Sequence, residues 1–278
     1  MTSGGSWDLH LGRSAAGKWI TIPLTNRGGI VVGGQPGSGK TAGLRSMLAP
    51  LMRSPSVQFA IVDGKGGSEW ASMGPRAFAC VPFSTELELI VCLLRTLEDE
   101  RVRRMSEMLR LRGSPNFWTN GPSADLPLIV LVIDEIQTLL DPSYYPRSDK
   151  QAQTLVAEAQ GLVKRLSALS RAAGIITALA TQKPTADSIP TQSRDNATAR
   201  LCFSVTSREA ARAVLGDRSD AESADDVSSP SPIGLPQGVA VAGLMGLGLV
   251  KVRVPFIPEQ VIYDTACSTA ELVQRPVA

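Results

Sequence analysis

A glycine-rich segment at residues 34–41 carries the residues best suited to bind phosphate. Glycines let the backbone curl so that successive N–H groups point at a phosphate, and the dipole of a following helix adds positive potential. Lys40 is expected to reach the β- and γ-phosphates of ATP, and the Thr41 hydroxyl to bind Mg²⁺. A chance glycine turn is the alternative, but a predicted strand before the segment and a helix after it favour a phosphate-binding loop. The segment matches the pattern G-x-x-x-x-G-K-[ST] and consists of Gly34, Gln35, Pro36, Gly37, Ser38, Gly39, Lys40 and Thr41.

An acidic pair, Asp134 and Glu135, follows the continuous apolar run at residues 128–133. Such a run is typical of a parallel strand buried on both faces, and it places the acids at the carboxyl edge of the sheet, where the glycine loop also ends. Asp134 is predicted to hold Mg²⁺, directly or through water, and Glu135 to polarise the attacking water as a general base. A solvated acid pair is the alternative. Kinases of small molecules need no water-activating glutamate, so the pair favours ATP hydrolysis.

Two further polar residues lie at predicted strand ends. Gln182 follows the apolar run at residues 175–180, and its amide is either a hydrogen-bonding partner of the γ-phosphate or water, or a plain surface group. Arg200 begins the next predicted strand. It is a candidate arginine finger that would stabilise charge on the phosphoryl group bound by a neighbouring subunit. An ordinary surface ion pair is the alternative for Arg200.

The elements that must position these residues alternate between strands and helices. This alternation predicts the α/β class, with a mostly parallel central sheet and helices on both faces. In the clearest helix, residues 86–112, apolar residues recur at three- and four-residue steps, while its arginines alternate with acids as on a solvated face. Strands are predicted at 18–22, 29–33, 58–63, 77–81, 128–133, 175–180, 201–206, 239–242 and 249–254. Helices are predicted at 40–53, 86–112, 152–173, 208–215 and 260–266.

Composition limits the classes of protein that the chain can represent. The 278 residues carry a net charge of +2, so any contact with nucleic acid must come from a local basic patch. The four cysteines have no C-x-x-C spacing, which argues against a zinc site and fits free thiols in the cytoplasm. No apolar run reaches the roughly 20 residues of a membrane span. We expect a tail at residues 1–17, one ATPase domain at 18–270 with a mobile loop at 217–232, and a second tail at 271–278.

Several motifs together resemble the FtsK/SpoIIIE family of motor ATPases, and they occur in the family's order over residues 18–264. The segments at 180–184 and 198–205 separate this family from other P-loop proteins better than the glycine loop does. We expect no membrane region before the motifs and no winged-helix module after residue 270, so the resemblance is strongest to the compact DNA translocases of actinobacterial conjugative and integrative elements. The motifs lie at residues 33–41, 61–65, 97–101, 134–135, 180–184, 198–205 and 250–256.

The resemblance implies a RecA-like P-loop NTPase that assembles into a hexameric ring, with ATP at the subunit interfaces and double-stranded DNA in the central pore. Lys183 and Arg194 are then candidate DNA contacts, although both fit a solvated loop equally well. The family also implies a cytoplasmic motor that a membrane-bound partner can recruit to the inner face of the cell membrane. Type VII secretion ATPases share the motor core, so a secretion motor that recognises a peptide signal is the alternative function. A nucleotide-binding scaffold without turnover is disfavoured by the intact set of Lys40, Thr41, Asp134 and Glu135.

Overall fold

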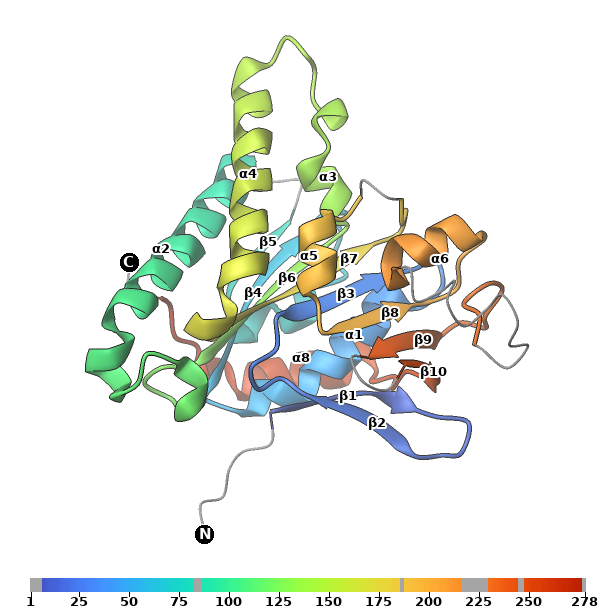
Figure 1. Ribbon diagram of the computed structural model, residues 1–278, viewed down its shortest axis with the longest axis horizontal. Coiled ribbons are helices and arrows are strands. Elements are labelled where there is room, and N and C mark those ends of the chain that lie inside the picture. The colour runs from blue at the N-terminus through green and yellow to red at the C-terminus, as the bar shows by residue number, and fades with distance from the viewer. Residues whose placement is uncertain (1–6, 83–86, 186–187, 217–229, 245–247, 277–278) are drawn as a thin grey trace.

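A mixed β-sheet runs through the centre of the molecule, as the computed structural model shows (Figure 1). The structure describes residues 7–82, 87–185, 188–216, 230–244 and 248–276. The strands are β1 (Asp8–Arg13), β2 (Trp19–Pro23), β3 (Gly29–Gly33), β4 (Val57–Asp63), β5 (Ala77–Pro82), β6 (Leu128–Asp134), β7 (Ile175–Thr181), β8 (Ala199–Cys202), β9 (Val239–Leu244) and β10 (Gly248–Arg253). The α-helices are α1 (Lys40–Leu48), α2 (Leu87–Arg112), α3 (Ile136–Leu140), α4 (Lys150–Leu169), α5 (Thr191–Asn196), α6 (Arg208–Leu215) and α8 (Glu259–Ser268).

The order of the strands brings the predicted functional residues to one edge of the sheet. Within the described residues the order is β2-β1-β10-β9-β8-β3-β7-β6-β4-β5. The six strands from β8 to β5 are parallel, and β9, β10, β1 and β2 extend the sheet with antiparallel pairings. The predicted mostly parallel α/β sheet is confirmed, as is the antiparallel pair near the carboxyl terminus. Because β3, β7 and β6 are parallel neighbours, the segments that follow them meet at their common carboxyl edge.

Helices cover both faces of the sheet, as predicted (Figure 1). Successive side chains of a strand point to opposite faces, so each buried strand contributes to two apolar cores. In β3, Val32 packs in the core that contains Leu44 of α1 and Ile262 of α8. Its neighbour Val31 packs in the second core, which contains Ile90 of α2 and residues of α4 and α6. The parallel strands β3, β4, β6 and β7 are therefore buried on both sides and hold the carboxyl edge rigidly.

The predicted amino-terminal tail, residues 1–17, is wrong in its second half. β1 lies in this segment and pairs antiparallel with β2. Leu9 and Leu11 are fully buried, and the intervening His10 is exposed, which is the period of two of a half-buried strand. This alternation covers only a few residues and is therefore a weak signal. The folded unit begins well before residue 18.

The predicted carboxyl-terminal tail, residues 271–278, is also partly wrong. The side-chain amide of Gln58, on buried β4, donates to the carbonyl oxygen of Leu272 at 2.8 Å. Its Oε1 accepts a hydrogen bond from the backbone N–H of Gln274 at 3.0 Å. A buried amide needs such partners, so the chain is fixed to the sheet at least as far as Gln274.

The segment after β8 departs from the predicted strand at residues 201–206. β8 ends at Cys202, because Ser204 leaves the sheet and its carbonyl oxygen accepts a hydrogen bond from the backbone of Gln35 at 2.8 Å. The predicted mobile loop, residues 217–232, lies outside the described residues up to 229. The carbonyl oxygen of Pro232 accepts from the N–H of Val205 at 3.2 Å, which returns the chain to the end of β8.

Arg76 fixes the connection that leads into the start of β4, at the end of the strand away from the functional edge, and its removal should destabilise the fold. The guanidinium is fully buried and donates to Gln58 and to the carbonyl oxygens of Met52, Ser54 and Val57. Arg76→Ala leaves these acceptors unsatisfied, so we expect a loss of roughly 3 kcal/mol in the free energy of unfolding. Urea denaturation measures the change.

Arg53→Ala is the matched control for Arg76→Ala, since Arg53 is exposed. It should change the free energy of unfolding by no more than about 0.5 kcal/mol. Equal stabilities of the two variants would show that the buried hydrogen bonds of Arg76 contribute nothing net.

Candidate active site

The glycine loop forms a cradle of backbone N–H groups at the start of α1. β3 is fully buried and leads directly into the loop. Gly37 and Gly39 have φ values of 76° and 90°, a left-handed conformation that favours glycine. These turns let the loop close on itself, with the N–H of Ser38 donating to the carbonyl oxygen of Gln35 at 3.2 Å. The loop and the free N–H groups of the first turn of α1 form an anion site, as the sequence pattern predicts.

Asp134 lies opposite this loop at the end of β6 and contacts donors from two parts of the chain, α1 and the connection after β4. Its carboxylate contacts the Lys40 ammonium in a buried ion pair, and it accepts hydrogen bonds from the Thr41 hydroxyl at 2.8 Å and the Trp70 indole at 3.1 Å. Burial pushes the pKa of Asp134 upward, but the Lys40 charge and the hydrogen bonds outweigh this effect and hold the pKa below its ordinary value. The carboxylate is therefore ionised at neutral pH.

Glu135 adopts a backbone conformation that few non-glycine residues take. Its φ of 57° and ψ of 52° lie in the left-handed region, at a cost on the order of 1–3 kcal/mol. The conformation turns the carboxylate towards β7, where it accepts hydrogen bonds from the backbone N–H of Gln182 at 3.1 and 3.2 Å. Burial raises the pKa of Glu135 and the nearby Lys40 charge opposes the rise. A buried, weakly solvated carboxylate beside a phosphate cradle has the properties of a general base.

Gln137 is a site residue that the sequence did not reveal. Its side-chain amide donates to Glu135, and its amide oxygen accepts from the Thr181 hydroxyl. The Thr181 hydroxyl in turn accepts from the backbone N–H of Lys183 at 3.1 Å. The sequence offered one signal for this residue, which is that Gln137 is a polar side chain within the mostly apolar segment that forms α3. Gln182 contacts Glu135 through its backbone N–H. The predicted contact of its side-chain amide with the γ-phosphate or water stays a prediction.

A second lysine, Lys65, also enters the site beside the end of β4. Asp63 of β4 is in register with Asp134 of β6, which brings the following turn next to the glycine loop. The Lys65 ammonium lies 3.4 Å from the Thr41 hydroxyl and 2.7 Å from the Glu69 carboxylate. Lys65 and Trp70 were missed as site residues because their approach depends on the pairing of strands that are far apart in sequence.

The oxygen donors in the site fit a magnesium ion that is shared with phosphates. Mg²⁺ usually takes one or two carboxylates, waters and substrate phosphates rather than a complete protein cage. Asp134 and Thr41 supply one carboxylate and one hydroxyl. Two buried side-chain oxygens nearby, Ser38 Oγ and Asp63 Oδ2, have no hydrogen-bond partner. Within the described residues no group of three or more His, Cys, Asp and Glu side chains could hold a metal ion.

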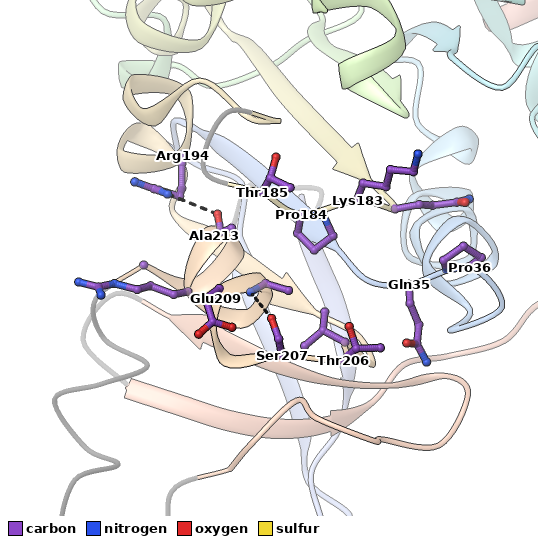
Figure 2. A pocket seen from close by; sticks show the side chains of 15 residues that line it. Gln35, Pro36, Lys183, Pro184, Thr185, Arg194, Thr206, Ser207, Glu209 and Ala213 are labelled. Atoms are coloured by element: carbon purple, nitrogen blue, oxygen red, sulfur yellow. Dashed lines mark hydrogen bonds between the residues drawn. The ribbon is translucent and has the colours of Figure 1, made fainter.

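Lys183 and Arg194 line one cavity of about 860 Å³ beside the tip of the glycine loop (Figure 2). Gln35 and Pro36 form the end of the cavity nearest the loop, and Glu209 of α6 forms another part of its wall. Arg194 lies on α5, which the sequence did not predict, and donates to the carbonyl oxygen of Ala213 at 3.5 Å. The structure thus brings the two predicted DNA contacts to a common surface, and their role stays a prediction.

Arg200 is the second residue of β8 and is held by its own subunit. Its Nη1 donates to the carbonyl oxygen of Leu215 at 2.9 Å, and its Nη2 lies 3.6 Å from the Asp195 carboxylate. The register pairs it with Val31, two residues before the end of β3. Its side chain is therefore fixed at some distance along the strand from the phosphate cradle, and the predicted arginine-finger role stays a prediction.

Comparison with known sequences identifies related proteins. The model of the FtsK/SpoIIIE family matches residues 3–117. The DNA translocase FtsK of Haemophilus influenzae is 28% identical over 245 residues, which cover 77% of this chain and 44% of that protein. FtsK of Lactiplantibacillus plantarum is 27% identical over 221 residues, which cover 74% of this chain and 26% of that protein. The chain thus spans less than half the length of these curated relatives.

Comparison with solved structures confirms the RecA-like P-loop fold. The pCW3 conjugation coupling protein TcpA, solved as a monomer with ATPγS, aligns with a TM-score of 0.77 at 24% identity over 97% of this chain and 71% of that one. The cytoplasmic domain of the type VII secretion ATPase EccC of Thermomonospora curvata aligns with a TM-score of 0.72 at 20% identity. That alignment covers 100% of this chain and 32% of EccC. These alignments show the shared fold, and the sequence matches show the predicted similarity of the chain to the FtsK/SpoIIIE family.

Proposed function

We propose that the chain is an ATP-hydrolysing motor that moves double-stranded DNA, as a homohexameric ring, during conjugative transfer or DNA segregation. The observation that carries the proposal is the buried Glu135 carboxylate, aimed across the edge of the sheet beside the Lys40–Asp134 pair. Support for a DNA substrate comes from the matched FtsK proteins, which are DNA translocases, and from TcpA, which is a conjugation coupling protein. A cytoplasmic location and recruitment by a membrane-bound partner belong to the same proposal. No helix among the described residues has the length and apolar character to cross a membrane.

Binding of ATP requires the Lys40 ammonium to exchange one anionic partner for another. Here it pairs with Asp134, and with nucleotide in the loop it would contact the β- and γ-phosphates. Asp134 and Thr41 would then hold Mg²⁺, which supplies charge neutralisation at the phosphates. The Trp70 indole remains as a donor that keeps the Asp134 carboxylate oriented.

Hydrolysis then depends on the position of Glu135. Its carboxylate would accept a proton from the attacking water, while the N–H of Gln182 and the amide of Gln137 keep it in place. The Gln182 side chain would bind the γ-phosphate or the water and thereby respond to the loss of phosphate. Movement in the segment after β7 would carry the nucleotide state to Lys183.

We expect Lys40→Ala to abolish detectable ATP binding, whereas Glu135→Gln should retain binding and lose turnover by at least about 100-fold. Lys40 contacts phosphates in the ground state, but Glu135 acts on the water in the transition state. Calorimetry with ATPγS and a steady-state phosphate-release assay separate the two effects. Glu88→Gln is the matched control, because Glu88 is exposed on α2. Turnover at the parental rate in Glu135→Gln would disprove the base assignment.

Arg200 is proposed to act in trans on the nucleotide of a neighbouring subunit. If so, inactive Arg200→Ala and inactive Lys40→Ala subunits should recover measurable hydrolysis when mixed, because some interfaces then hold one intact copy of each residue. The control mixture combines Lys40→Ala with Glu135→Gln, two residues that serve the same nucleotide from one subunit, and should stay inactive. Mixed rings without recovery would show that Arg200 does not act on the nucleotide of a neighbouring subunit.

Lys183 and Arg194 are proposed to contact DNA phosphates, since a motor that moves along any sequence depends little on base edges. Replacing both with Ala should lower DNA-stimulated hydrolysis and make the salt dependence of DNA binding shallower, by about two in the slope of log K against log salt. The control Lys164→Ala/Lys251→Ala removes the same charge from exposed positions outside the cavity. Unchanged stimulation in the first variant would exclude both residues from DNA binding. A parent protein stimulated by a peptide and not by duplex DNA would favour the secretion motor.

A further inference from the structure

Lys65 is a second lysine beside the glycine loop, and the proposed mechanism gives it no role. Its ammonium lies 3.4 Å from the Thr41 hydroxyl oxygen, which is the oxygen expected to bind Mg²⁺. The same hydroxyl donates to the Asp134 carboxylate at 2.8 Å. A hydroxyl that donates one hydrogen bond keeps the lone pairs of its oxygen for another donor or for a metal ion. In the structure Lys65 takes the place on Thr41 that Mg²⁺ would take.

The backbone of Lys65 is fixed at the edge of the sheet, so this approach is a property of the fold. The N–H of Lys65 donates to the Asp63 carboxylate at 3.1 Å, and the N–H of Gly64 donates to the carbonyl oxygen of Asp134 at 2.8 Å. The connection after β4 has no free space here, because a Cβ added to Gly64 would collide with the same carbonyl oxygen. A change of partner by Lys65 would therefore be a movement of its side chain.

Glu69 is the other partner of the Lys65 ammonium. The two charged groups lie 2.7 Å apart, and their side chains are 24% and 44% exposed. An ion pair between side chains this exposed contributes little net stability, so Lys65 can leave it for a stronger anion. Arg45 of α1 donates to the Glu69 carbonyl oxygen and to the Ser72 hydroxyl, which holds this part of the connection against α1. Glu69 is thus a fixed resting partner for a lysine side chain that can move.

Binding of Mg·ATP would change both contacts of Lys65 for an electrostatic reason. Mg²⁺ on the Thr41 oxygen would repel a neighbouring ammonium, so Lys65 must leave this oxygen. Mg²⁺ neutralises only part of the negative charge of a triphosphate, and the remaining charge favours further cations. Lys40 would supply one of them and must give up Asp134 to do so. Lys65 is a second cation that already lies on the metal side of the phosphate cradle.

We propose that Lys65 is a second phosphate-binding lysine, which leaves Thr41 and Glu69 when Mg·ATP binds and contacts phosphate oxygens on the metal side of the triphosphate. The inference rests on the proposed ATPase function and adds a residue that touches the substrate. Glu69 then competes with the nucleotide for the same ammonium. Removal of the lysine and removal of the competing carboxylate should therefore have opposite effects on nucleotide binding.

The test is a double-mutant cycle in which binding of Mg·ATPγS is measured by calorimetry. Lys65→Met should weaken binding by about tenfold, the effect of one lost charge-assisted hydrogen bond. Glu69→Gln should strengthen binding by about twofold to fivefold, because a weak surface ion pair no longer competes. The double variant Lys65→Met/Glu69→Gln should bind like Lys65→Met alone. Lys164→Met removes an exposed lysine of α4 and should bind like the parent.

Unchanged or tighter binding in Lys65→Met would overturn the proposal. Unchanged or weaker binding in Glu69→Gln would also overturn it, because the ion pair would then serve only to hold the connection after β4. In these cases the ATPase function would stand, provided that the parent binds Mg·ATPγS and Lys40→Ala does not. A parent chain that does not bind Mg·ATPγS would overturn the proposed function and this inference with it. Thermal unfolding of each variant verifies that the fold is retained.

Discussion

The buried negative charge of Asp134 is the constraint on which the rest of the site depends. Removing a carboxylate from water costs several kcal/mol unless charged and hydrogen-bonding partners replace the solvent. The partners here come from separate elements: Lys40 and Thr41 from α1, and Trp70 from the connection after β4. Each must be delivered at the correct place on the edge of the sheet. The register that sets Asp63 beside Asp134 is therefore as necessary to the site as the glycine loop.

The strained backbone conformation of Glu135 depends on the rigid carboxyl edge of the sheet. A left-handed glutamate is tolerated because β6 is buried on both faces and because Gln137 and the N–H of Gln182 hold the carboxylate. The same contacts join the end of β6 to the end of β7. Any ligand that displaces the carboxylate must also disturb the segment that continues to Lys183. The position of the Glu135 carboxylate is thus linked through a few hydrogen bonds to the cavity that Gln35, Lys183 and Arg194 line.

The sequence predicted those parts of the site that are encoded locally. The glycine loop and the Asp134–Glu135 pair each combine a short motif with a neighbouring apolar strand, and both lie where expected. Trp70, Lys65 and Gln137 escaped prediction because their proximity arises from strand order and register, which no local pattern reports. For the same reason the segment that forms β1 was predicted as a tail. Its two buried leucines are recognisable as core residues only once β1 is paired with β2 and β10.

The antiparallel extension explains why the loop has two unlike sides. Parallel strands alone would place a symmetric edge around the phosphates, with solvent beyond the loop. β9 and β10 instead fasten a second wall to Ser38 through Gly238, and β1 and β2 continue that wall outward. One side of the loop then faces the acids and amides that are proposed to act on water. The other side faces a cavity lined by Trp19 and Phe256. The antiparallel extension of the sheet thus gives the two sides of the loop chemically different surroundings.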